Sequence, residues 1–187
     1  MTASIHIQFL WLCYNYPMII RSAVPEDAPG LTKVRQQGWL FAYRGLMPDA
    51  ILDQMDGEKE TRRWKEKIAQ PPVNSYLLCV EIDREVVGFC AGGKNRDADD
   101  VYDGEIYALY VLPDRHNQGI GRALVKMGMD WLRDRGYRQM LIWVLRDNQK
   151  ARRFYEAVGG KLERERQIEI GGTALMEVGY GYNLSLK

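Results

Sequence analysis

The chain has 187 residues, of which 46% are hydrophobic and 27% are charged. This length and composition are typical of one globular domain with a sizeable core, and they exclude a disordered chain. Because 26 basic residues balance 25 acidic ones, no excess of charge points to nucleic acid or a membrane as the partner.

The cysteines and histidines form no metal-ligand pattern. Cys13, Cys79 and Cys90 are odd in number and widely spaced, and His6 and His116 are too few for a histidine-rich site. We therefore expect no metal cofactor, and a reducing cytoplasm is the simplest setting for the thiols.

The N-terminal segment is apolar but does not match a targeting signal. Ile5–Tyr16 is too short to span a bilayer and has no basic residues ahead of it. Met18–Ala23 then reads as a first strand. We interpret residues 1–17 as an N-terminal extension and 18–187 as the domain, with an extra edge strand or a partner-contact segment as the alternative.

Two helical stretches precede the first pair of long strands. Acidic residues after Pro25 favour a helix start, and an apolar stripe continues as far as Tyr43. A proline pair at 71–72 ends the second stretch, and strand patterns follow it. The expected elements are a helix over Pro25–Tyr43, a helical stretch over Pro48–Ala69 broken near Gly57, and strands Ser75–Ile82 and Val86–Gly92 joined at Asp83-Arg84.

The segment from Gly104 to Leu124 is the most informative part of the chain. It predicts a strand that ends at Pro113-Asp114, with odd-numbered residues on one face and even-numbered residues on the other. From Ile120 the apolar residues recur at helical spacing, so the glycines at 119 and 121 lie in the first helical turn. That turn offers free backbone N–H groups and the positive end of the helix dipole, which favour a phosphate group.

Two familiar phosphate motifs fit this turn poorly. A nucleoside-triphosphate loop needs Lys followed by Ser or Thr after its last glycine, and here Arg122-Ala123 follows. A dinucleotide fingerprint needs a third glycine where this chain has Leu124, and an acidic residue where Arg146 ends the next strand. The plain alternative is that the two glycines only ease a tight strand-to-helix turn.

The C-terminal part continues the alternation of strands and helices. The expected elements are a strand over Met140–Leu145, a helix over Asn148–Glu156 that stops at Gly159-Gly160, and a hairpin of Lys161–Ile170 and Thr173–Leu186 turned by Gly171-Gly172. The whole order is β-α-α-β-β-β-α-β-α-β-β, an α/β (α+β) arrangement.

Two motifs in this order resemble the GNAT superfamily of N-acetyltransferases. The stretch His116–Gly121 is similar to the family signature Q/R-x-x-G-x-G/A, and Asn148–Glu156 looks like its N-x-x-A-x-x-F/L-Y-E helix. The resemblance covers about Met18 to the C-terminus and implies a single mixed, mostly antiparallel sheet of about seven strands flanked by helices. His116 departs from the family's Gln or Arg, so we expect weaker or pH-dependent coenzyme A binding.

The resemblance implies acetyl-CoA as the co-substrate. In this family, the signature strand diverges from the next parallel strand and leaves backbone groups free for pantetheine, which implicates the backbone of Leu109 and Val111. The other implied cofactor-binding residues are His116, Asn117, Gln118, Gly119, Ile120, Gly121, Arg122 and Asn148.

Two residues are candidates for proton transfer. Glu105 stands where some GNAT enzymes place a general base, although a glutamate at a strand start more often faces solvent. Phe154 falls with Ala151 and Val158 on the expected buried stripe of the helix, which turns Tyr155 toward the cofactor as the acid. The alternative for Tyr155 is a boundary residue with its hydroxyl in water.

The acceptor is the least determined part of the prediction. By resemblance, Trp39, Tyr43, Arg44 and Tyr76 line its side, although Trp39 could be core and Arg44 a solvated cation at a helix end. We expect transfer of acetyl to a primary amine of a small molecule in a ternary complex, in the cytoplasm, with no nucleic-acid or membrane partner; a homodimer is compatible with this. The alternatives are acetylation of protein N-termini or lysines, and a non-catalytic acyl-CoA-binding module.

Overall fold

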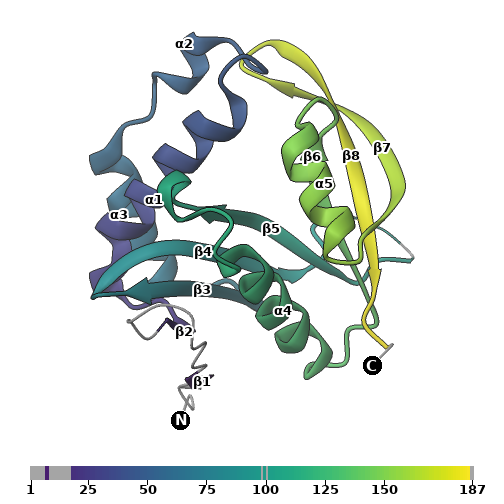
Figure 1. Cartoon of the computed structure of the whole chain (residues 1–187), viewed down its shortest axis with the longest axis horizontal. Coiled ribbons are helices and arrows are strands. Elements are labelled where there is room, and N and C mark those ends of the chain that lie inside the picture. Colours follow the sequence, from purple (N-terminus) through teal and green to yellow (C-terminus); the bar gives the residue numbers. More distant parts are fainter. Residues whose placement is uncertain (1–6, 9–17, 98, 100, 186–187) are drawn as a thin grey trace.

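The computed structural model describes residues 7–8, 18–97, 99 and 101–185. Its centre is one sheet with the strand order β1-β2-β3-β4-β5-β6-β8-β7. Among the described strands only β5 and β6 run parallel; every other neighbouring pair is antiparallel. The sheet is therefore mixed and mostly antiparallel, as predicted (Figure 1).

The elements alternate along the chain as the sequence predicts. The strands are β1 (Ile7–Gln8), β2 (Ile19–Ser22), β3 (Ser75–Ile82), β4 (Glu85–Lys94), β5 (Gly104–Val111), β6 (Gln139–Leu145), β7 (Lys161–Ile170) and β8 (Thr173–Asn183). The helices are η1 (Pro25–Asp27), α1 (Ala28–Tyr43), α2 (Asp49–Leu52), α3 (Gly57–Ala69), η2 (Pro113–Arg115), α4 (Ile120–Arg133) and α5 (Gln149–Ala157).

The seven strands expected from the sequence are β2 to β8, and the short β1 adds an outer edge. β1 pairs antiparallel with β2, so that Ile7 lies opposite Ile20. Most of the proposed N-terminal extension, residues 1–6 and 9–17, lies outside the described residues. The division between an extension and a domain at residue 17 stays a prediction.

Helices cover both faces of the sheet. α1 packs on β4 and β5, where Gly38 lies against the ring of Tyr110, and α3 packs beside α1. α4 packs on the other face, where Gly128 lies against the side chains of Tyr76 and Ile106. α5 lies next to α4, since a Cβ atom on Gly121 would stand 3.2 Å from the Phe154 ring.

A β-bulge interrupts the alternation of β5. Ala108 pairs with Ala91 and Ile106 pairs with Gly92, so Tyr107 is an extra residue without a partner of its own on β4. Ile106 consequently faces α4 while Tyr110 faces α1, although strict alternation puts both on one face. The prediction that all even-numbered residues share a face was wrong for this reason.

The buried core runs along both sides of the sheet. Its largest fully buried side chains include Leu31 of α1, Phe89 of β4, Leu124 of α4 and Tyr180 of β8. Within the part of the chain that the structure describes, no helix is both long and apolar enough to cross a bilayer.

Candidate active site

The parting of β5 and β6 opens a cavity in the described structure. The parallel ladder joins only Gly104, Glu105 and Ile106 to 140–142, and beyond it the two strands diverge. A cavity of about 780 Å³ fills the gap, bounded by α1, β5, β6 and the starts of α4 and α5. Figure 1 shows α1, drawn in blue, and α5, drawn in green, standing apart above β5.

The divergence leaves backbone groups of β5 turned toward the cavity. In an antiparallel ladder, successive residues direct their N–H and C=O groups to opposite sides. Leu112 donates its N–H to Val87 O on the β4 side, so Val111 and Leu109 direct theirs to the side that β6 has left. Both residues line the cavity.

The glycine-rich turn forms one corner of this cavity. Gly119 caps α4 in the left-handed conformation, with φ of 80°, and Ile120 begins the helix. The cavity is lined by Gly119, Ile120, Gly121 and Arg122, whose first-turn N–H groups have no intrahelical acceptor. This corner therefore offers hydrogen-bond donors and the positive helix end to an anion.

His116 contributes to the mouth of the cavity. Its Nε2 atom lies 3.0 Å from Val111 O, one of the backbone groups directed at the gap. Its ring meets the ring of Phe41 edge-on at 4.9 Å, and Lys150 Nζ lies 4.1 Å from the Phe41 ring centre. Three elements thus meet at the mouth: α1, the turn after η2 and α5.

The start of α5 forms the opposite wall. Asn148 caps this helix by accepting a hydrogen bond from the Ala151 N–H at 3.1 Å, and it lines the cavity. Phe154 and Tyr155 both line the cavity, but Tyr155 is the buried residue and Phe154 is half-buried against Gly121. The predicted buried stripe of Phe154, Ala151 and Val158 packs against the core but is only partly buried, so the prediction that it leaves Tyr155 outside the core was wrong.

Three of the four tyrosines that line the cavity come from three different elements: Tyr43 of α1, Tyr110 of β5 and Tyr155 of α5. Burial raises the pKa of each of these hydroxyls above its ordinary value. These groups are neutral hydrogen-bond donors at neutral pH.

Glu105 lies beside the cavity rather than in its wall. Its side chain is 1% exposed and is absent from the residues that line the cavity. Arg96 binds it through the backbone N–H and Nε, each 3.1 Å from Oε2, and through Nη2, which donates to Oε1.

The other predicted acceptor residues are distributed around the site. Trp39 packs edge-on against Tyr43 at 4.6 Å without lining the cavity, and Arg44 is exposed and faces Asp53 of the segment after α2. Tyr76 lies in the core under α4, with its hydroxyl 3.7 Å from Cys90 Sγ. Gln118 is exposed beside the turn. The structure therefore brings only Tyr43 of the four predicted acceptor residues into the cavity wall.

Several wall residues were not predicted from the sequence. Tyr107 and Trp143 are the first residues of β5 and β6 beyond their ladder, and both line the cavity. The predicted parallel pairing of these strands was the signal that could have found them. The cationic side chains of Arg115, Lys150 and Arg153 also line it, together with Phe41.

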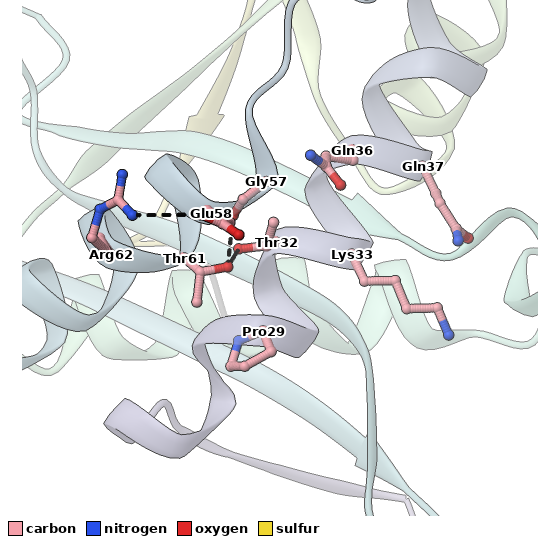
Figure 2. Close-up of a pocket in the computed structure, with 9 residues that line it drawn as sticks. All are labelled: Pro29, Thr32, Lys33, Gln36, Gln37, Gly57, Glu58, Thr61 and Arg62. Atoms are coloured by element: carbon pink, nitrogen blue, oxygen red, sulfur yellow. Dashed lines mark hydrogen bonds and ion pairs between the residues drawn. The ribbon is translucent and has the colours of Figure 1, made fainter.

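A second hollow of about 500 Å³ lies between α1 and α3 (Figure 2). Its lining is polar: the Thr32 and Thr61 hydroxyls share a hydrogen bond of 2.9 Å, and Glu58 and Arg62 form an exposed ion pair. None of the residues predicted to act in catalysis or binding lines it. Among the described residues, no three His, Cys, Asp or Glu side chains gather in a way that could hold a metal ion.

Comparison with known proteins identifies this arrangement. The model of the acetyltransferase (GNAT) family matches residues 39–159 of this chain. The uncharacterized N-acetyltransferase YuaI of Bacillus subtilis is 31% identical over 163 residues, which cover 87% of this chain and 91% of that protein. The chain therefore belongs to the GNAT family and is an N-acetyltransferase.

Solved structures share the fold. PaiA N-acetyltransferase from Thermoplasma acidophilum, solved in complex with coenzyme A, superimposes with a TM-score of 0.68 and 22% identity, covering 86% of this chain and 97% of that one. YncA, an acetyltransferase from Salmonella typhimurium solved with acetyl-CoA, gives 0.67 and 20%, covering 89% and 94%. The predicted fold is confirmed.

Proposed function

We propose that this N-acetyltransferase uses acetyl-CoA to acetylate a primary amine of a small molecule. The observation that carries the proposal is the continuity of one cavity. It extends from the glycine-rich start of α4, through the gap between β5 and β6, to the aromatic side chains of Tyr43, Tyr107 and Trp143. Coenzyme and acceptor can therefore occupy it together, which direct transfer in a ternary complex requires.

The cofactor end of the cavity suits coenzyme A. The pyrophosphate would accept hydrogen bonds from the first-turn N–H groups of α4, and Arg122, Lys150 and Arg153 would offset phosphate charge at the mouth. Pantetheine would pair with the free backbone groups of Leu109 and Val111, and it would have to share Val111 O with His116. PaiA and YncA, which share the fold, were solved with coenzyme A and acetyl-CoA.

The chemistry is an attack of the neutral amine nitrogen on the thioester carbonyl carbon. A new C–N bond forms, the C–S bond breaks, the amine loses one proton and the coenzyme thiolate gains one. The sequence predicts Tyr155 as the donor of that proton, which is supported by its position in the cavity wall and by a hydroxyl that burial keeps protonated at neutral pH. The sequence also predicts Glu105 as the base, a role for which its carboxylate would have to exchange Arg96 for the amine.

A contact between the β7–β8 hairpin and α2 favours a small acceptor over a folded protein. Gly171, at the tip of the β7–β8 hairpin, approaches Ile51 of α2 so closely that a Cβ atom there would stand 2.7 Å from Ile51 Cδ1. The hairpin tip and α2 thus meet at the top of the molecule (Figure 1). That contact would hinder the approach of an extended peptide from the side of the hairpin and α2, although neither Gly171 nor Ile51 lines the cavity itself.

The test is release of free coenzyme A thiol from acetyl-CoA across a panel of small amines and peptides. We expect release with one or more small primary amines and intersecting initial-velocity lines, which indicate a ternary complex. Acetyl-CoA should also raise the melting temperature, because a ligand that binds only the folded state stabilises it. Turnover with peptides alone would overturn the small-molecule proposal, and binding without any turnover would favour a non-catalytic module.

A further inference from the structure

The carboxylate of Glu105 is not free to act as a general base, because other groups already bind it. The carboxylate is buried at the start of β5, and both of its oxygens already accept hydrogen bonds from Arg96. Arg96 itself follows β4, and 58% of its side chain is exposed. A buried carboxylate bound on both oxygens by a guanidinium holds that guanidinium in one orientation.

Arg96 makes a second contact, with Tyr107. Its Cζ atom lies 4.5 Å from the centre of the Tyr107 ring, a cation–π geometry. The Tyr107 hydroxyl donates a hydrogen bond to Lys94 O, so the ring is fixed at its face and at its tip. Glu105 is therefore linked to the cavity wall indirectly, because it binds Arg96 and Arg96 contacts Tyr107.

Tyr107 occupies a decisive place in the sheet. It is the extra residue of the β5 bulge, and it is the first residue of β5 beyond the ladder with β6. A bulge bends its strand and increases the local twist. Tyr107 thus lies at the point where the two strands part and the cavity begins.

We propose that Glu105 is a positioning residue, which acts through Arg96 to hold Tyr107 at the parting of β5 and β6, and that it does not take the amine proton. Deprotonation of the amine is then left to solvent. The inference rests on the proposed function for its kinetic readouts, but its binding readout is independent of turnover.

A double-mutant cycle separates a positioning pair from a base. If Glu105 acts only through Arg96, then Glu105→Gln, Arg96→Gln and the double variant should each lower kcat/KM by a similar factor, about 10- to 100-fold. The dependence of kcat/KM on pH should keep its wild-type shape in Glu105→Gln. Loss of a general base would instead cost about 10²–10⁴-fold in Glu105→Gln alone and change that shape.

Binding of acetyl-CoA gives the second readout. Tyr107 lines the wall that the acyl end must pass, so Glu105→Gln and Arg96→Gln should both weaken acetyl-CoA binding about fivefold, measured by titration calorimetry. If Glu105 acted only as a base and its replacement left the cavity wall intact, the affinity for acetyl-CoA would stay unchanged. This readout holds even if no acceptor amine is found.

Two controls keep the experiment interpretable. Arg164→Gln removes the partner of Asp99 in the same loop while leaving Arg96 and Glu105 paired, so it should stay within about twofold of wild type. Arg96→Gln leaves a buried carboxylate without its cation and could unfold the protein, whereas the double variant removes both charges. If Arg96→Gln does not fold, equal losses in Glu105→Gln and the double variant support the proposal. A Glu105→Gln loss with unchanged acetyl-CoA affinity, or an altered pH profile, overturns it.

Discussion

Tyr155 joins the buried core to the reaction site. Its ring lies 5.3 Å from Phe154 and 6.0 Å from Tyr180, and its side chain lines the cavity between β6 and α5. Burial raises the pKa of its hydroxyl well above the ordinary value, so the group is protonated at neutral pH. The hydroxyl is therefore available there as a hydrogen-bond donor.

Replacing Tyr155 with Phe removes only that hydroxyl. We expect turnover with a good acceptor to fall by about 10²–10³-fold and acetyl-CoA affinity to stay within about threefold of wild type. Because the hydroxyl does not ionise between pH 6 and 10, the loss should be the same across that range, as steady-state rates at several pH values would show. Tyr180→Phe is the matched control, since that hydroxyl binds Glu156 and Arg152 and lies outside the cavity wall. Equal turnover in Tyr155→Phe and wild type would assign the proton to another donor.

The proposed role of the start of α4 in cofactor binding can be tested by comparing variants at the glycines on either side of this helix. Gly119 precedes the helix with φ of 80° and Gly136 follows it with φ of 84°, and no atom lies within 4 Å of a Cβ built on either one. Asn tolerates this left-handed conformation better than other residues with a side chain. Either glycine replaced by Asn should therefore cost about 1 kcal/mol or less of stability.

Only the variant at the helix start should affect the cofactor. A side chain at Gly119 would project into the corner lined by the first-turn N–H groups, so Gly119→Asn should weaken acetyl-CoA binding by about tenfold or more. Gly136→Asn should bind acetyl-CoA like wild type. Calorimetric titration of both variants measures this difference, and equal affinities would place the phosphates elsewhere.

The order of the elements could be predicted because turn residues mark their ends. Asp83 and Arg84 both adopt positive φ in the β3–β4 turn, and Gly171 and Gly172 do so between β7 and β8. The bulge at Tyr107 and the polar contacts of Arg96 could not be predicted in the same way. The bulge at Tyr107 depends on pairing with β4, and the Arg96 contact to Glu105 joins residues nine positions apart through a loop. Such contacts depend on tertiary packing, which the local sequence pattern does not predict.

At the scale of the whole molecule, the cavity separates two parts of one sheet. Strands β2 to β5 carry α1, α3 and α4, whereas β6 to β8 carry α5, and the short β5–β6 ladder is the strand pairing that joins them. A ligand in the gap contacts both parts, which explains why acetyl-CoA should stabilise the folded chain. The edge farthest from the cavity must be held by other interactions.

An ion-pair network holds that edge. Asp27 of η1 accepts hydrogen bonds from Arg21 of β2 at 2.6 and 2.8 Å and from the Val24 N–H at 2.8 Å. Arg21 also binds Glu81 of β3. Burial of Asp27 opposes its ionisation, but the hydrogen bonds from Arg21 and Val24 outweigh burial, and the pKa of this carboxyl is lowered.

Asp27→Asn should lower the free energy of unfolding by about 2–3 kcal/mol at neutral pH, because it leaves Arg21 with one carboxylate instead of two. Since the pKa of Asp27 is lower in the folded protein than its unfolded value of about 3.9, the ionised group contributes stability above that value. The difference between wild type and variant should therefore be constant from pH 7 to 5 and shrink as the pH falls toward 3, as urea unfolding at each pH would measure. Lys33→Gln, which breaks an exposed pair with Glu85, should cost less than about 1 kcal/mol at every pH. A difference for Asp27→Asn that stays unchanged down to pH 3 would show that packing of the side chain, rather than its charge, holds this edge of the sheet.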